Sequence, residues 1–156
     1  NHMISFTKEL TERVPVDSRQ IVRFEKGLIG LPHLKVFALI EDELSMPIRL
    51  LQSVTMQDFV FVAINPFTVY PNYDIEISDE DATHLGVRSP ADVLVLSIVT
   101  IPDDLRFVTA NLLSPLVINM RTKAGKQILL SDTDYPINYR ILKDAPGGAS
   151  GLRLAS

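Results

Sequence analysis

The chain has 156 residues, 46 % of them apolar and 22 % charged, with no cysteine and a formal net charge of −4. This length suits one domain that buries roughly 68–70 % of the surface its unfolded chain would expose. The apolar content and small net charge exclude a mainly disordered chain, and the lack of cysteine excludes disulfide scaffolds and thiolate-ligated metal sites.

Short apolar runs, many with a period of two residues, dominate the chain and are typical of β-strands. The β-branched run 93–101 predicts a central strand buried on both faces. Ala124-Gly125 predicts a hairpin turn. Prolines fall at the edges of the runs, as expected, because a proline inside a central strand removes a ladder hydrogen bond. The expected strands are 19–25, 35–40, 48–54, 58–65, 73–77, 93–101, 107–113, 116–121, 127–130 and 137–142.

One helical region interrupts the strands. Ser78 precedes the acidic residues 79–81, an arrangement that favours a helix start because acids stabilise the positive end of a helix. Gly86 predicts the C-terminal cap of this helix. Ser89-Pro90 repeats a start signal, with proline at the first helical position, and predicts a second short turn.

These elements predict a mainly β fold, a small antiparallel β-barrel or barrel-like sandwich of about ten strands with one short helical insertion. No repeat or internal linker divides the chain, so residues 4–143 are expected to form a single domain. Residues 144–156, rich in Gly, Ala and Ser, predict a flexible tail, and residues 1–2 are interpreted as an expression-tag remnant. Because no apolar run is long enough for a membrane span or a signal peptide, we expect a cytoplasmic protein.

Charge is distributed unevenly along the chain. Residues 72–104 contain eight acids and one base, a local charge of −7, whereas residues 105–156 contain seven bases and three acids, a local charge of +4. An acidic block repels phosphate, which disfavours direct nucleic-acid binding, and it attracts a basic protein partner. The alternative is a solvated surface whose acids only start helices, and the sequence leaves both interpretations open.

Signatures of catalysis are missing. His33 and His84 have no partner at the short spacing that a metal site requires, and His84 is expected to stabilise the C-terminal end of the helix. The chain has no nucleophile elbow and no complete phosphate-binding loop. The sequence therefore predicts no enzyme, no metal and no cofactor.

Six sequence motifs point to a known family. They are FEKGLIGLP (24–32), LQSV (51–54), FVAINPF (61–67), VLVLSIVTI (93–101), TANLLSPLVIN (109–119) and QILLSDTDY (127–135). In this order and spacing the chain resembles the flagellar assembly factor family FliW from about residue 6 to 143. The most specific motif is TANL followed by a proline and the VIN strand.

The resemblance implies a non-enzymatic β-barrel in the cytoplasm that binds flagellin and the RNA-binding regulator CsrA, which represses flagellin translation. Abundant flagellin would occupy the protein, as a client occupies a chaperone. Export of flagellin would free the protein to remove CsrA from the message, coupling flagellin synthesis to filament assembly. The implied protein touches neither nucleic acid nor membrane directly, and we expect a monomer or weak oligomer.

The sequence offers candidates for both contacts. A regulator that holds RNA must be basic, so exposed acids of the acidic block are expected to antagonise CsrA. Flagellin ends are amphipathic and need an apolar groove or a sheet edge, which loop aromatics could supply. A structural role is the alternative for every candidate. They are Glu76, Asp79, Glu80, Asp81, Asp103 and Asp104 for CsrA, and Asn65, Phe67, Tyr70 and the mid-strand Asn111 for flagellin or a partner backbone.

A second class of function stays open. Closed barrels commonly hold a ligand at the mouth, so a small-ligand- or flavin-binding barrel is the alternative. A nucleic-acid-binding barrel would need a basic stripe with exposed aromatics, and the cluster of Arg121, Lys123 and Lys126 is too small for that.

Overall fold

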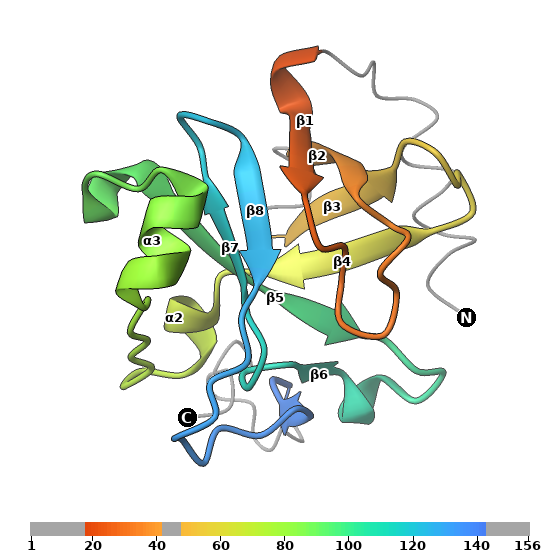
Figure 1. The fold of residues 1–156 in the computed structure, drawn as a ribbon. Coiled ribbons are helices and arrows are strands. Elements are labelled where there is room, and N and C mark those ends of the chain that lie inside the picture. Colours follow the sequence, from red (N-terminus) through yellow and green to blue (C-terminus); the bar gives the residue numbers. More distant parts are fainter. Residues whose placement is uncertain (1–17, 42–47, 143–156) are drawn as a thin grey trace.

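The computed structural model describes residues 18–41 and 48–142, and within them nine strands form one sheet (Figure 1). The strand order is β4-β3-β2-β1-β8-β7-β5-β6-β9, and β4 also pairs with β5. That extra pairing closes seven strands into a barrel, which β6 and β9 extend. The strands are β1 (Ile21–Phe24), β2 (Val36–Glu41), β3 (Ile48–Ser53), β4 (Val60–Ile64), β5 (Val93–Thr100), β6 (Thr109–Ala110), β7 (Leu116–Asn119), β8 (Ala124–Gln127) and β9 (Tyr139–Arg140).

The prediction of a mainly β barrel is confirmed, with one difference in strand direction. Every ladder is antiparallel except β1–β8, where Arg23 pairs with Ala124 and Phe24 with Gly125 in parallel. This parallel pair joins the first barrel strand to the last. No local sequence signal predicts such a pairing between distant strands. The predictions for residues 1–2 and 144–156 concern positions outside the described residues.

Alternating side chains of the strands supply two hydrophobic clusters, one on each face of the closed sheet. In β2, Phe37 and Leu39 enter one cluster while Ala38 and Ile40 enter the other. The period-two pattern of the sequence reflects this packing. β5 pairs with β4, β6 and β7, as predicted for the central strand.

Two predicted strands are displaced or lost for identifiable reasons. Residues 73–77 alternate between exposed positions and positions that are buried or half-buried, but they belong to no strand. The predicted strand 127–130 begins three residues earlier, at Ala124, so Ala124-Gly125 is not the hairpin turn. β8 ends at Gln127 because Pro115, opposite Ile128, has no N–H to donate, although Ile128 N–H still donates to the Pro115 carbonyl at 2.9 Å.

In the C-terminal third of the chain, two predicted strands are longer than the observed ones. The expected strands 107–113 and 137–142 shrink to the two-residue strands β6 and β9. The start of the predicted strand 107–113 is taken up by the 3₁₀ helix η4 (Leu105–Phe107), whose N-cap is Asp104. The side-chain oxygen of Asp104 accepts the N–H of Arg106 and so favours a helical turn where apolar residues alone suggested a strand.

Short helices begin where capping residues allow. The helix α3 (Asp79–Leu85) starts at Ser78 and ends at Gly86, whose φ is 71°, and the 3₁₀ helix η3 (Pro90–Asp92) follows Ser89, all as predicted. The helix α2 (Pro66–Val69) and the 3₁₀ helix η1 (Ser18–Gln20) were not predicted. α2 carries the start signal of an N-cap asparagine followed by proline, which a strand-and-loop interpretation overlooked.

Candidate protein-binding site

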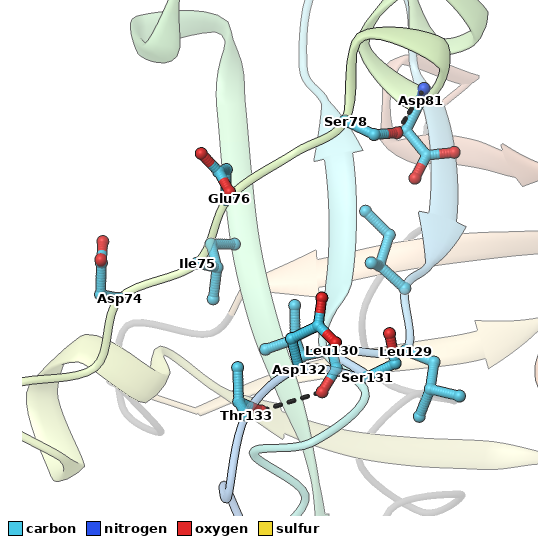
Figure 2. A pocket seen from close by; sticks show the side chains of 11 residues that line it. Asp74, Ile75, Glu76, Ser78, Asp81, Leu129, Leu130, Ser131, Asp132 and Thr133 are labelled. Atoms are coloured by element: carbon cyan, nitrogen blue, oxygen red, sulfur yellow. Dashed lines mark hydrogen bonds between the residues drawn. The ribbon is translucent and has the colours of Figure 1, made fainter.

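The extended segment 73–78 connects α2 to α3, and its residues line two grooves. The first, the acidic groove, has a volume of about 590 Å³. Figure 2 shows its two walls, residues 74–81 on one side and residues 128–133 on the other. Four of its lining residues are acids, namely Asp74, Glu76, Asp81 and Asp132. The other lining residues are Ile75, Ser78, Ile128, Leu129, Leu130, Ser131 and Thr133.

The walls of the acidic groove are tied together at both ends. At one end, the Lys126 ammonium donates to the carboxylate of Asp81, at 2.5 Å. At the other, the Tyr135 hydroxyl accepts the N–H of Asp74 (2.9 Å) and lies 3.2 Å from the Asp74 carbonyl. These contacts join residues 45 and 61 positions apart in the chain and fix the spacing between the two walls.

Asp81 is a negative charge held within the groove. Its side chain is 14 % exposed, and the hydrogen bond from Lys126 holds its pKa below the usual value. The Ser78 hydroxyl, which accepts the N–H of Asp81, is the N-cap of α3 and also lowers this pKa. The carboxylate therefore stays ionised at neutral pH, and the neighbouring Lys126 ammonium neutralises its charge. The net negative charge of the groove comes from its other three acids.

The Asp81–Lys126 pair predicts a pH-dependent contribution to stability. A depressed folded-state pKa stabilises the fold above the unfolded-state pKa, and this stabilisation is lost as pH falls through the folded value. We expect Lys126→Met to be destabilising at neutral pH, and its difference from the parent to shrink below about pH 4. Urea unfolding across this range measures the effect, with exposed Lys35→Met as the control. A difference independent of pH would contradict the assignment.

The second groove, the apolar groove, shares Ile75 with the acidic groove and is also lined by Ile77 of segment 73–78. Its volume is about 460 Å³. Phe67, the second residue of α2, contributes a ring that is 44 % exposed. The remaining lining residues come from segment 73–78, α3, the turn after it and β5. They are Ile75, Ile77, Ala82, Val87, Arg88, Ser89, Pro90, Val93 and Val95.

All four tyrosines of the chain form a cluster that includes Tyr73, the first residue of segment 73–78. Tyr70 lies 5.1 Å from Tyr139 and 5.5 Å from Tyr135, and Tyr73 lies 4.7 Å from Tyr135, between ring centroids. Tyr73 donates its hydroxyl hydrogen to the Leu112 carbonyl at 2.6 Å, and burial raises its pKa. The half-buried Tyr70 thus packs within the protein, whereas Phe67 at the edge of the cluster remains available at the surface.

The two candidate asparagines serve the backbone. Asn65 is the N-cap of α2, and its side-chain oxygen accepts the N–H of Phe67 at 2.9 Å. Asn111 follows β6 instead of lying mid-strand, and its side-chain oxygen accepts the N–H groups of Leu113 (3.1 Å) and Ser114 (3.0 Å). Both side chains shape turns here, and a partner contact by either stays a prediction.

The acidic block does not form one surface. Asp79 and Glu80 are exposed on the first turn of α3, next to the acidic groove. Asp103 and Asp104 lie beyond the opposite end of β5, an eight-residue strand that spans roughly 25 Å. The Arg106 guanidinium donates to Asp104 at 2.8 Å and lowers the pKa of that carboxyl. Acids from one stretch of sequence, residues 72–104, are here separated by the length of a strand.

Several residues of this site were not among the sequence candidates, including three that carry charge or hydrogen bonds at the acidic groove. Lys126, Asp132 and Tyr135 all lie in the basic C-terminal part of the chain, far from residues 74–81 in sequence. His84, expected only at the end of α3, also contacts Glu25 at 2.8 Å. Within residues 18–41 and 48–142, no three His, Asp or Glu side chains are grouped so that they could hold a metal ion. No helix there is long and apolar enough to cross a membrane.

Comparison with known proteins gives a consistent result. The family model of FliW protein matches residues 5–141. A flagellar assembly factor FliW of Clostridium botulinum is 32 % identical over 139 residues, covering 89 % of this chain and 99 % of the relative. That of Caldicellulosiruptor saccharolyticus is 37 % identical over 129 residues, covering 83 % and 84 %. A crystal structure of the flagellar assembly factor FliW superposes with a TM-score of 0.75 at 36 % identity, covering 81 % of this chain and 89 % of that one.

Proposed function

The chain belongs to the FliW family of flagellar assembly factors, and we propose that it acts by binding flagellin and antagonising the translational regulator CsrA. The observation that carries the proposal is that one segment, residues 73–78, lines both an apolar and an acidic groove. Two adjacent surfaces of different chemistry suit two different protein partners. In this proposal the protein is cytoplasmic and works through recognition alone, without converting a substrate.

The apolar groove is the proposed flagellin surface. Export-competent flagellin ends are amphipathic, and an amphipathic helix buries its apolar face in such a groove. Phe67 combines high exposure with a rigid position, because Asn65 caps α2 and the Phe67 ring packs 5.4 Å from Tyr73. A large, immobilised aromatic at a groove edge is a typical anchor for a partner segment.

Phe67→Ala is expected to weaken flagellin binding about three- to tenfold, because full burial of a phenylalanine contributes on the order of 1.5–3 kcal/mol and a partner would bury the 44 % of Phe67 that is exposed. The measurement is a titration of purified flagellin monomer against the full chain. Phe107→Ala is the matched control, since Phe107 is 49 % exposed and lies in η4, away from the groove. Full retention of flagellin by a folded Phe67→Ala protein would remove this groove from the proposal.

The acids around the acidic groove are the proposed CsrA surface. CsrA must be basic enough to hold RNA phosphates, and complementary charge speeds association and fixes orientation. Docked acids would also repel RNA over about 8–10 Å, the screening length near physiological salt. Glu76 and Glu80 are exposed and face solvent from adjoining elements, which supports a role for both.

Reversing these two charges tests the proposal. The double variant Glu76→Lys/Glu80→Lys is expected to weaken CsrA binding by roughly tenfold or more at low salt and to reduce its salt dependence. Asp103→Lys/Asp104→Lys carries the same change at the far end of β5 and is expected to have a smaller effect, because Arg106 already offsets Asp104. Calorimetric titration of CsrA at two salt concentrations measures both. Unchanged affinity and salt dependence in the first variant would exclude this surface.

A further inference from the structure

Residues 75–77 present an unpaired length of extended backbone. Among the described residues, the N–H and C=O groups of Ile75, Glu76 and Ile77 make no hydrogen bond, although Asp74 before them and Ser78 after them do. Backbone polar groups left unpaired are an open template for another strand. This segment is held rigidly in that state, because the tyrosine cluster and the N-cap of α3 anchor its two ends.

The side chains of the segment define the chemistry that would pair with it. Asp74 and Glu76 are exposed, while Ile75 and Ile77 are half-buried against the hydrophobic cluster beneath. In a neighbouring strand, residues opposite Asp74 and Glu76 would also point outward, about 4.5–5.5 Å away between Cβ atoms. Lysine or arginine there would form cross-strand ion pairs, and the alternate residues would face the apolar floor.

The opposite wall of the acidic groove also suits a strand in which basic and apolar residues alternate. Leu129 is 57 % exposed and Leu130 is buried, so this wall offers apolar contact, while Asp132 adds a carboxylate at the rim. Figure 2 shows these side chains across the groove from Ile75 and Glu76. A nucleic-acid strand would be repelled by the carboxylates. A helix would leave the backbone of residues 75–77 unpaired, because its own backbone groups are already bonded to one another.

We propose that the acidic groove receives an extended segment of a partner protein as an added β-strand, with basic residues alternating with apolar ones. The inference deepens the proposed function and rests on it for the assumption that a basic partner docks at this face. Backbone hydrogen bonds to residues 75–77 supply affinity, and the alternation of charge supplies specificity, as in other strand-addition complexes.

The test uses a short fluorescein-labelled peptide in which lysine alternates with valine, titrated against the full chain by anisotropy at low salt. A scrambled peptide with its lysines grouped keeps the charge and loses the alternation. Two further versions carry N-methyl groups on alternate amides, each blocking one edge of the strand. We expect one methylated version to lose about tenfold or more in affinity and the other to bind as the parent does, because only one edge faces residues 75–77.

Protein variants and amide exchange complete the test. Glu76→Lys is expected to lower the affinity for the parent peptide ~tenfold. Asp58→Lys, the same charge reversal in the exposed turn before β4, is expected to change this affinity by no more than about twofold. Amide exchange at residues 75–77 should slow on binding. Equal binding of both methylated peptides and the scrambled one, or no binding of the parent peptide, overturns strand addition even if CsrA binds. Edge-selective peptide binding without any CsrA binding would instead overturn the proposed function alone.

Discussion

Gly27→Ala is expected to destabilise the fold by ~3 kcal/mol or more, far beyond the effect of the same substitution at Gly30. Both glycines have positive φ, 69° and 83°, so alanine introduces backbone strain of about 1–2 kcal/mol at either position. Only Gly27 is also crowded, since a Cβ there would lie 2.6 Å from the Cα of Pro32, against no atom within 4 Å at Gly30. The loop must shift to accept it.

That shift reaches the core. Leu28 and Leu34, on either side of Pro32, are 4 % and 0 % exposed and belong to one of the two clusters. Displacing the loop would therefore expose apolar surface in addition to straining the backbone. Urea unfolding followed by far-ultraviolet circular dichroism compares the two variants, because the chain has no tryptophan to report fluorescence. Variants whose unfolding free energies agree within about 0.5 kcal/mol would refute the crowding argument.

Signals that act within a few residues were readable in the sequence. Ser78 and Gly86 mark the ends of α3 because a cap is a bond or a dihedral angle of the residue itself. The period-two runs located the barrel strands because each strand buries alternate side chains. The same pattern misled at residues 73–77, since alternation reports one-sided packing and not backbone pairing.

The candidate site could be predicted only in part, because it is assembled from distant segments. Glu76 and Asp81 were identified from local charge, yet Asp132 and Lys126 enter the same groove from the basic end of the chain. Conversely, Asp103 belongs to the same acidic stretch of sequence as Glu76, residues 72–104, and β5 carries it to the other end of the sheet. Local composition sets the sign of a surface, whereas the order of strands decides which charges share it.

Asn119 links the β7–β8 hairpin to α3, and Asn119→Ala is expected to cost about 2–3 kcal/mol. The side chain is fully buried, and its amide donates to the Leu85 carbonyl at 2.8 Å. Its oxygen accepts the N–H groups of Arg121 (2.8 Å) and Thr122 (3.2 Å), which shapes the turn of the hairpin. Alanine removes all three bonds and leaves a cavity under the C-terminal end of α3.

Asn111→Ala is the matched control, because the Asn111 side chain also accepts two backbone N–H groups but, among the described residues, bonds to no helix and is only half-buried. Amide exchange should become faster in α3 (Asp79–Leu85) with Asn119→Ala and stay unchanged there with Asn111→Ala. Since α3 carries Asp81 and follows directly on residues 75–77, loosening it should also weaken CsrA binding, although no acid is altered. Unchanged protection of α3 in Asn119→Ala would show that the hydrogen bonds from Arg121, Thr122 and Lys126 hold the helix to the hairpin without Asn119.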